Sequence, residues 1–214
     1  MRILALDTCL GACSVAIWED GQARASASEL MARGHQERLA PMARAAASEA
    51  GLAFAELDRI AVTVGPGSFT GLRVGLAFAK ALALALDRPC LGISVLEALG
   101  RGSPRPGFAA AAIDAHRGQV YLQAFIDAAP VMAPDVLPVE TAAARLAELH
   151  PGGPAVLIGS GAPLLSAALP KASLEPDALP DPIAVAAMAA AMRPPFAPAR
   201  PLYLRAPDAQ PMVS

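Results

Sequence analysis

The chain has 214 residues, of which 55% are hydrophobic and 17% are charged, and its formal net charge is −2 at pH 7. This length allows one sizeable domain or two small lobes. A near-neutral net charge without any run of Lys or Arg is a poor electrostatic match for direct RNA binding. The most apolar run, residues 76–86, is interrupted by Lys80 and is shorter than the roughly 20 residues of a bilayer span, so we expect no membrane segment.

The start of the chain and its three cysteines favour a cytoplasmic location. Arg2 is followed at once by a strand-like run, unlike the long apolar region of a signal peptide. Cys9, Cys13 and Cys90 are an odd-numbered set, which does not suggest a disulfide framework, and no clustered His accompanies them to form a metal site. We therefore interpret the cysteines as reduced core residues of a cytoplasmic protein.

The first half of the chain predicts a β-hairpin followed by alternating helices and strands. Short β-rich runs bounded by turn residues predict the strands, and longer apolar stretches predict the helices. Pro41 lies inside the first predicted helix, so we expect a kink or a late start there. The expected elements are strands at 3–7, 13–18, 22–28, 60–64 and 90–93, and helices at 35–50, 70–86 and 95–99.

The opening pattern of the first half occurs again in the second half. Asp7 ends one strand-like run and Gly11 follows four residues later, and Asp114 and Gly118 stand in the same relation. A second strand-like run follows in both places, which indicates an internal duplication. The other elements expected in this half are strands at 119–126 and 155–158 and helices at 140–149, 162–168 and 182–192.

Composition predicts the boundaries between the parts of the chain. The stretch at 100–107 is rich in Gly, Pro and Arg, as is typical of a boundary between lobes. We therefore expect an N-terminal lobe at 1–100 and a C-terminal lobe at 101–192. Residues 193–214 are rich in proline and are expected either to pack back on the N-terminal lobe or to be partly disordered.

Two duplicated halves that each begin with a hairpin are the layout of the actin-like ATPase fold, which sugar kinases and Hsp70 share. We therefore expect an α/β protein of this fold, with two duplicated lobes of mixed sheet plus helices. In that fold the opening hairpins hold nucleotide phosphates between the lobes. Asp7 and Asp114 would then face a metal ion, whereas the alternative is that each carboxylate only caps its turn.

The glycine-rich loop from Gly65 to Gly71 joins a predicted strand to a predicted helix. Glycines let backbone amides approach a ligand, and a helix N-terminus attracts anions. The loop lacks the Lys-Ser/Thr ending of a P-loop and is one residue too long for the dinucleotide fingerprint, so a tight connection in which Thr70 caps the helix is an equal alternative. The candidate phosphate-contacting residues are Asp7, Thr8, Gly65, Gly67, Ser68, Thr70 and Gly71.

The helix after this loop is almost wholly apolar, because Lys80 is the single charged residue in 74–86. A helix that is apolar on all sides must be covered on all sides, and a small lobe tends to leave one face of such a helix bare. The bare face would be a partner site. The alternative is a central core helix between the sheet and a second helix.

The sequence lacks the usual catalytic and metal-binding patterns. His35, His116 and His150 are scattered, and Leu39 instead of a second His follows His35 by one helical turn. Neither a Gly-x-Ser-x-Gly elbow nor a His-Glu-x-x-His helix occurs, and Ser68 has no evident base beside it. We therefore predict no catalytic residue and no metal site.

Five segments resemble the TsaB (YeaZ) family of tRNA threonylcarbamoyladenosine biosynthesis proteins. They are residues 3–8, 35–41, 65–75, 114–121 and 201–205, of which 65–75 is the most specific. The resemblance covers essentially the whole chain and is weakest in the middle of the second lobe. It implies an actin-like ATPase fold and a non-catalytic role, because the His-x-x-x-His metal pair of the catalytic paralogue TsaD is reduced here to His35.

The resemblance also implies partners. TsaD transfers a threonylcarbamoyl group to N6 of the adenosine next to the anticodon, the ATPase TsaE joins the complex, and tRNA is reached only through the complex. The TsaD contact is implied on the helices at 35–50 and 70–86, and the isolated protein is implied to form a homodimer through the same surface. The implied interface residues are His35, Leu39, Met42, Arg73, Leu76, Ala77, Phe78, Lys80 and Ala81.

No cofactor is expected on this chain alone, and ATP or ADP is expected only at the joint with TsaD. A second class of function stays open beside the scaffold. It is a nucleotide-dependent phosphotransferase, or the protease that older descriptions of this superfamily suggest. Magnesium-dependent ATP binding that is lost on Asp7→Ala would favour this enzyme class.

Overall fold

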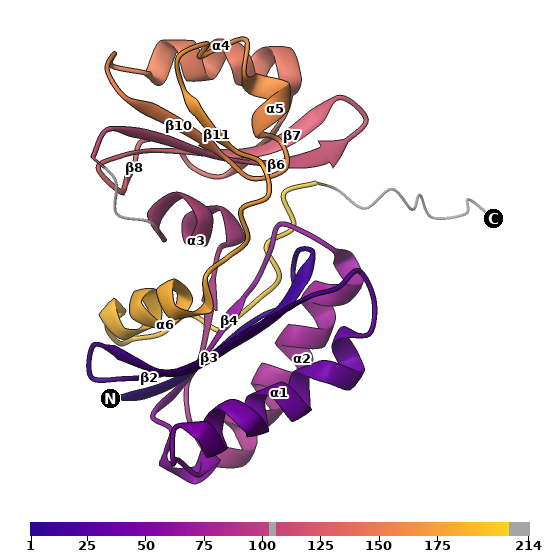
Figure 1. Ribbon diagram of the computed structural model, residues 1–214, viewed down its shortest axis with the longest axis vertical. Helices are drawn as coiled ribbons and strands as arrows, with labels where there is room; N and C mark the ends of the chain where they lie inside the picture. The colour runs from indigo at the N-terminus through magenta and orange to yellow at the C-terminus, as the bar shows by residue number, and fades with distance from the viewer. Residues whose placement is uncertain (103–105, 206–214) are drawn as a thin grey trace, which may run out of the picture.

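The computed structural model describes residues 1–102 and 106–205, which fold around two mixed β-sheets (Figure 1). The first sheet has the strand order β3-β2-β1-β4-β5. In this sheet β1 pairs antiparallel with β2 and parallel with β4. β1 is buried on both faces, as its nearly unbroken apolar sequence leads one to expect. The strands are β1 Arg2–Asp7, β2 Ala12–Glu19, β3 Gln22–Leu30, β4 Arg59–Thr63 and β5 Cys90–Ile93.

The second sheet repeats this topology with the order β11-β10-β6-β7-β8, and β9 also pairs with β7. Here β6 pairs antiparallel with β7 and parallel with β10, as β1 does with β2 and β4. The shared topology agrees with the predicted duplication. The strands are β6 Phe108–His116, β7 Gln119–Ile126, β8 Ala129–Pro130, β9 Asp135–Pro138, β10 Ala155–Ile158 and β11 Ser173–Glu175. The short strands β8, β9 and β11 were not predicted.

Helices cover both faces of each sheet (Figure 1). On the first sheet, α1 and α2 pack against one face and α6 against the other. On the second sheet, α4 and α5 lie on one face and α3 on the other, so α3 and α6 lie between the two sheets. The helices are α1 His35–Glu49, α2 Phe69–Leu86, α3 Val95–Arg101, α4 Val139–Leu149, α5 Ala162–Leu165 and α6 Pro182–Ala191, with a short 3₁₀ helix at Phe54–Glu56.

The packing crosses the boundary predicted between residues 100 and 101. Although all but the last residue of α3 precedes that boundary, the helix packs on the second sheet. α6 returns from the second half of the sequence to the first sheet. The proline-rich segment also reaches the first lobe, where Ala199 is buried and the backbone N of Leu202 donates to the carbonyl oxygen of Val64 (2.7 Å). Residues 206–214 of the predicted tail lie outside the described residues.

Two helices bear on the expectations. α1 begins at His35, as predicted, so the alternative of a late start at Pro41 is wrong, and the proline ring is tolerated on the exposed side of the helix. α2 has 18 residues and is longer than the apolar run at 76–86, and by length and composition alone it could cross a membrane. However, α2 packs on the first sheet, as a core helix of a folded lobe does. Its buried residues are Gly71, Leu72, Gly75, Leu76, Ala79 and Ala83.

Candidate functional site

A cleft of about 880 Å³ lies between the two lobes. Its walls come from the turn after β1, the loop before α2, the end of β6 and the segment after β11. Gly67 and Ser68 of the predicted phosphate-contacting residues line this cleft, and so does Asp114. Thr70 instead lines the groove between α1 and α2, and Asp7, Thr8, Gly65 and Gly71 are buried.

The carboxylate of Asp7 is fully buried at the end of β1. Its Oδ1 accepts hydrogen bonds from Thr63 Oγ1 (2.5 Å) and from the backbone N of Cys9 (3.2 Å), whereas its Oδ2 has no partner within the described chain. Burial raises the pKa of Asp7 to about 6, although these hydrogen bonds act to lower it. The bond to Cys9 N is the turn-capping arrangement, and Asp7 is not among the residues that line the cleft.

The loop before α2 packs tightly against the turn after β1. The backbone N of Ser68 donates to the carbonyl oxygen of Cys9 (2.7 Å), and a Cβ at Gly67 would overlap the same carbonyl group. A Cβ at Gly71 would overlap the carbonyl oxygen of Thr8. These two glycines therefore permit a close approach of two backbone segments.

This packing occupies amides that a phosphate would need. Besides Ser68 N, the backbone N of Gly71 is used, because it donates to Ser68 Oγ (3.2 Å). The N-cap of α2 is thus Ser68, whereas the sequence predicted Thr70. Because the helix begins at Phe69, Ser68 Oγ is in position to accept a hydrogen bond from the backbone N of the third helical residue. The geometry favours a tight strand-to-helix connection over a phosphate cradle between the lobes.

Asp114 lies inside β6 and not in the turn that follows. Its Oδ1 accepts a hydrogen bond from the backbone N of His116 (2.7 Å), and its Oδ2 lies 3.4 Å from His116 Nδ1. The Asp114 amide in turn donates to Ser160 Oγ (3.1 Å). Asp114 therefore organises the β6–β7 turn while part of its carboxylate stays on the cleft wall.

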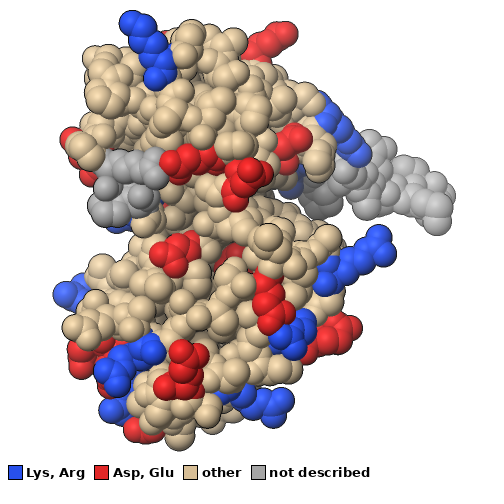
Figure 2. Space-filling model, in the orientation of Figure 1, with Lys and Arg blue, Asp and Glu red and all other residues tan. Residues whose placement is uncertain are grey.

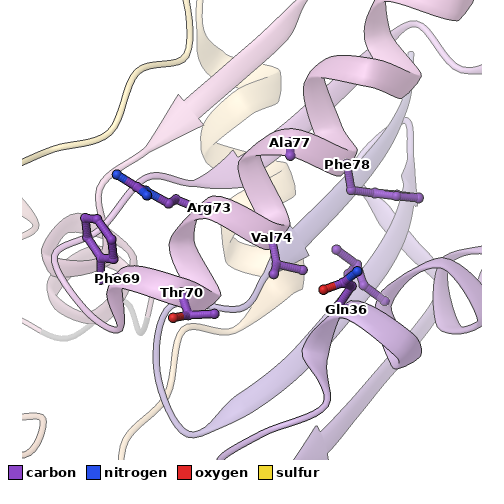
Figure 3. Close-up of a pocket in the computed structure, with 8 residues that line it drawn as sticks. Gln36, Phe69, Thr70, Arg73, Val74, Ala77 and Phe78 are labelled. Atoms are coloured by element: carbon purple, nitrogen blue, oxygen red, sulfur yellow. The ribbon is translucent and has the colours of Figure 1, made fainter.

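A second concave site, a groove of about 510 Å³, runs between α1 and α2 (Figure 3). Figure 3 shows Gln36 of α1 across from Val74 of α2, with Phe69 and Arg73 toward one end and Phe78 toward the other. The Arg73 guanidinium stacks over the Phe69 ring at 3.7 Å, and Tyr203 of the C-terminal segment lies 6.2 Å from that ring between centroids. The groove thus combines exposed aromatic and aliphatic surface with one cation.

Part of the predicted partner interface lies on the exposed side of α2. Arg73, Ala77, Lys80 and Ala81 are exposed, and Phe78 is half-buried. Three of these five line the groove, namely Arg73, Ala77 and Phe78. Leu84 continues the same helix and is 84% exposed.

The remaining predicted interface residues are buried within this chain, although Leu39 also lines the groove. Leu39, Met42 and Leu76 are 1%, 5% and 7% exposed and belong to the cluster that packs α1 and α2 on the first sheet. His35 is 8% exposed at the start of α1. The cause is helical spacing, since residues three or four apart share one face and the sheet covers the face that holds these side chains.

The structure adds Gln36, Phe69 and Val74 to the groove, and the sequence had not singled out any of them. A signal for the orientation of α2 was nevertheless present. Gly71, Gly75, Ala79 and Ala83 recur every four residues, and a stripe of small residues marks the side where a helix lies close to a sheet. The opposite side then carries the groove.

Within residues 1–102 and 106–205, no group of three or more His, Cys, Asp or Glu side chains is placed to hold a metal ion. Leu39 presents a hydrocarbon side chain to the core one turn after His35. His35 Nε2 is buried and has no hydrogen-bond partner in this part of the chain.

Comparison with known proteins gives a consistent result. Residues 27–188 match the family described as TsaD, tRNA N6-adenosine threonylcarbamoyltransferase. The chain is 43% identical to the tRNA threonylcarbamoyladenosine biosynthesis protein TsaB of Escherichia coli over 124 residues, which are 56% of this chain and 53% of that protein. This match therefore spans about half the length of the curated relative.

Solved structures extend the likeness to nearly the whole chain. YeaZ from Pseudomonas aeruginosa is similar with a TM-score of 0.80 and 33% identity, over 95% of this chain and 99% of that one. An activator of 2-hydroxyisocaproyl-CoA dehydratase from Clostridium difficile, solved with ADPNP, has a TM-score of 0.55 and 10% identity over 88% and 94% of the two chains. The second likeness shows the fold alone, and together they confirm the predicted actin-like ATPase fold.

Proposed function

Because the chain belongs to the TsaB (YeaZ) proteins of the tRNA N6-adenosine threonylcarbamoyltransferase family, we propose that it is a non-catalytic subunit for making threonylcarbamoyladenosine in tRNA. In this proposal the chain holds and activates the transferase TsaD. The observation that carries it is the groove between α1 and α2, which exposes apolar and aromatic surface along one side of a long helix. Such surface, flanked by Arg73 and Lys80, is typical of a protein interface.

The non-catalytic part of the proposal rests on the core side of α1. The resemblance places a metal-binding His pair on this helix in TsaD, and here the second position is Leu39, which is packed into the apolar core. A leucine side chain has no atom that can ligate a metal. The transfer chemistry is therefore assigned to the partner.

The remaining partners follow from the same premise. We assign the ATPase TsaE to the complex, and tRNA binding to the complex and not to this chain. Net charge supports the last point, since the chain carries −2 and Figure 2 shows Lys and Arg interspersed with Asp and Glu on an otherwise uncharged face. In isolation the exposed face of α2 is proposed to pair with a second copy, and the protein is placed in the cytoplasm.

Nucleotide is proposed only at the joint with TsaD. Asp7 is buried, and the amides of Ser68 and Gly71 already have partners, so this chain alone offers few free donors to phosphates in the cleft. Calorimetry with ATP and magnesium on the isolated chain discriminates this proposal from a nucleotide-dependent enzyme. Tight binding that is lost in Asp7→Ala would support the enzyme instead.

The interface is tested by placing charges on the exposed side of α2. Ala77 and Ala81 are exposed and lie one helical turn apart, so Ala77→Glu and Ala81→Glu should keep the fold. We expect each to weaken retention by affinity-tagged TsaD at least about tenfold, because a carboxylate would be buried against apolar surface. Ala147→Glu, on an exposed position of α4 in the other lobe, is the matched control.

Reconstituted tRNA modification gives the second readout. Omission of this chain, or its replacement by Ala77→Glu, should reduce threonylcarbamoyladenosine formation, and Ala147→Glu should support it fully. Equal retention of all three variants by TsaD would contradict the proposed surface. Full modification without the chain would contradict the proposed role.

A further inference from the structure

The C-terminal segment at 199–205 runs from the first lobe toward the second sheet (Figure 1). Ala199 is 3% exposed and belongs to the core of the first lobe. A Cβ on Gly92 of β5 would lie 3.4 Å from the Cα of Ala199, so the two backbones are close. The backbone N of Leu202 donates to the carbonyl oxygen of Val64, just after β4 (2.7 Å). This part of the segment is therefore fixed to the first lobe near the ends of β4 and β5.

The end of the segment contacts the second lobe. Arg205 Nη2 donates to Gln119 Oε1 (2.5 Å), and the guanidinium carbon lies 6.0 Å from the ring centroid of Tyr121. Gln119 and Tyr121 both belong to β7. Just before Arg205, Leu204 packs against an apolar cluster that contains side chains of both lobes. The segment thus joins the two lobes beside the cleft, which Arg205 also lines.

The segment is too short to allow the lobes much freedom. Leu202 is bonded to the first lobe, and Arg205, three residues later, is bonded to the second. Three residues reach at most about 10 Å when they are fully extended. While both contacts hold, Val64 and Gln119 cannot move far apart, so the segment limits the width of the cleft on this side.

The two ends of the segment are held with different strength. On the first lobe, the buried Ala199 and a backbone hydrogen bond hold it, and the Tyr203 ring lies 6.2 Å from the Phe69 ring of α2 between centroids. On the second lobe, Arg205 and Gln119 are both half-buried, so each can exchange its partner for water. Release should therefore occur at Arg205 while the rest of the segment stays on the first lobe.

We propose that residues 199–205 act as a strap that holds the two lobes together, with the bond from Arg205 to Gln119 as its releasable end. Release of Arg205 opens the cleft, and its return to Gln119 closes it. Domain opening of this kind needs only a few residues to change conformation, and the chain crosses between the lobes in short connections from β5 to α3 and from β11 to α6. The strap does not depend on the proposed role with TsaD.

The distance between the lobes, measured by pulsed electron spin resonance between two spin labels, tests the strap. α1 and α4 lie at opposite ends of the molecule (Figure 1), so Ala45→Cys and Ala147→Cys, both at exposed positions, place one label on each lobe. Cys90→Ser removes the half-buried native thiol, and Cys9 and Cys13 are buried. Thermal unfolding of each labelled protein shows that it is folded.

Arg205→Ala and Gln119→Ala should each move part of the distance distribution to larger values. The double variant should add no further shift, because both changes remove the same bond. Arg200→Ala removes an exposed cation of the same segment and should leave the distribution unchanged. The Leu202 amide should keep its protection from hydrogen exchange in all these variants, since its bond to the first lobe remains.

An unchanged distribution in Arg205→Ala and Gln119→Ala, or the same shift in Arg200→Ala, would overturn the proposal. Loss of Leu202 protection in Arg205→Ala would also overturn it, because the whole segment and not its end would then detach. Either Arg205→Ala or Gln119→Ala is sufficient if the other does not fold. TsaD is not present in this measurement, so the strap and the proposed function can fail separately.

Discussion

Thr8 Oγ1 donates a hydrogen bond of 2.7 Å to the carbonyl oxygen of Gly71, although 63 residues separate the two in the sequence. The bond joins the end of β1 to the first turn of α2. Gly71 is essential to this contact, because a Cβ there would overlap the carbonyl oxygen of Thr8. The orientation of α2, and with it the position of the exposed groove, therefore depends on this pair.

Gly71→Ala should destabilise the protein by about 1–3 kcal/mol, because the added methyl group meets rigid backbone. The higher helix propensity of Ala offsets about 1 kcal/mol of the strain and does not remove it. Urea unfolding measures the difference. Gly11→Ala is the matched control, since nothing lies within 4 Å of a Cβ there, and an equal loss in both variants would contradict the contact.

Asp7→Asn should stabilise the protein at neutral pH. The folded chain holds the Asp7 proton up to about pH 6, whereas the unfolded chain releases it near the ordinary value of 3.8. Between these values the folded state binds more protons, so stability falls as pH rises through this window and the loss is complete above about pH 6. The amide mimics the protonated carboxyl, so the gain should be near zero at pH 4 and about 2–3 kcal/mol at pH 7.

Urea unfolding of both proteins between pH 4 and pH 8 measures this gain. Other carboxylates titrate in both proteins, so the difference between the two curves isolates Asp7. A stability difference that does not vary with pH would show that ionisation of Asp7 is not its cause.

The sequence was sufficient to predict the duplicated topology, because each half contains a local strand–Asp–turn–strand pattern that indicates a hairpin. It was not sufficient for the choice between a phosphate cradle and a tight connection at residues 65–71. That choice depends on Cys9 and Thr8, which lie next to the loop because β1 and β4 pair in the sheet. Loop spacing alone is compatible with both geometries.

The predicted interface residues lie partly on the exposed side of α2 and partly in the core beneath α1 and α2. Leu39, Met42 and Leu76 are as apolar as the exposed residues, so composition does not separate them. The four-residue spacing from Gly71 to Ala83 does separate the faces. The sequence near α3 and α6 does not indicate that α3 packs on the second sheet and α6 on the first. These positions arise from the path of the chain between the two sheets.

Leu76→Ala distinguishes core from interface on α2. Removal of this buried side chain should cost about 2–4 kcal/mol through the cavity it leaves. The folded variant should still be retained by TsaD, since the exposed side of α2 is unchanged. Thermal unfolding measures the loss of stability, and affinity capture by TsaD well below the midpoint of unfolding measures binding. Loss of capture in a variant that keeps its full stability would show that Leu76 belongs to the interface.

Arg59 ties α6 to the first sheet. Its Nη1 donates to the carbonyl oxygens of Ala189 (2.7 Å) and Met192 (3.1 Å) at the C-terminal end of α6, and its guanidinium lies 4.9 Å from the Phe196 ring centroid. Arg59→Met keeps much of the apolar stem but leaves these carbonyls without their donor, so we expect a loss of about 1–3 kcal/mol.

Hydrogen exchange should locate the effect of Arg59→Met in α6, because the helix end loses its anchor while β4 keeps both neighbouring strands. Arg59→Lys should restore less than half of the stability, since one ammonium group reproduces neither the planar stacking nor the fixed donor geometry. Arg200→Met, an exposed arginine of the C-terminal segment, is the control. An equal loss in Arg200→Met, or faster exchange spread evenly over both lobes, would show that Arg59 does not anchor α6.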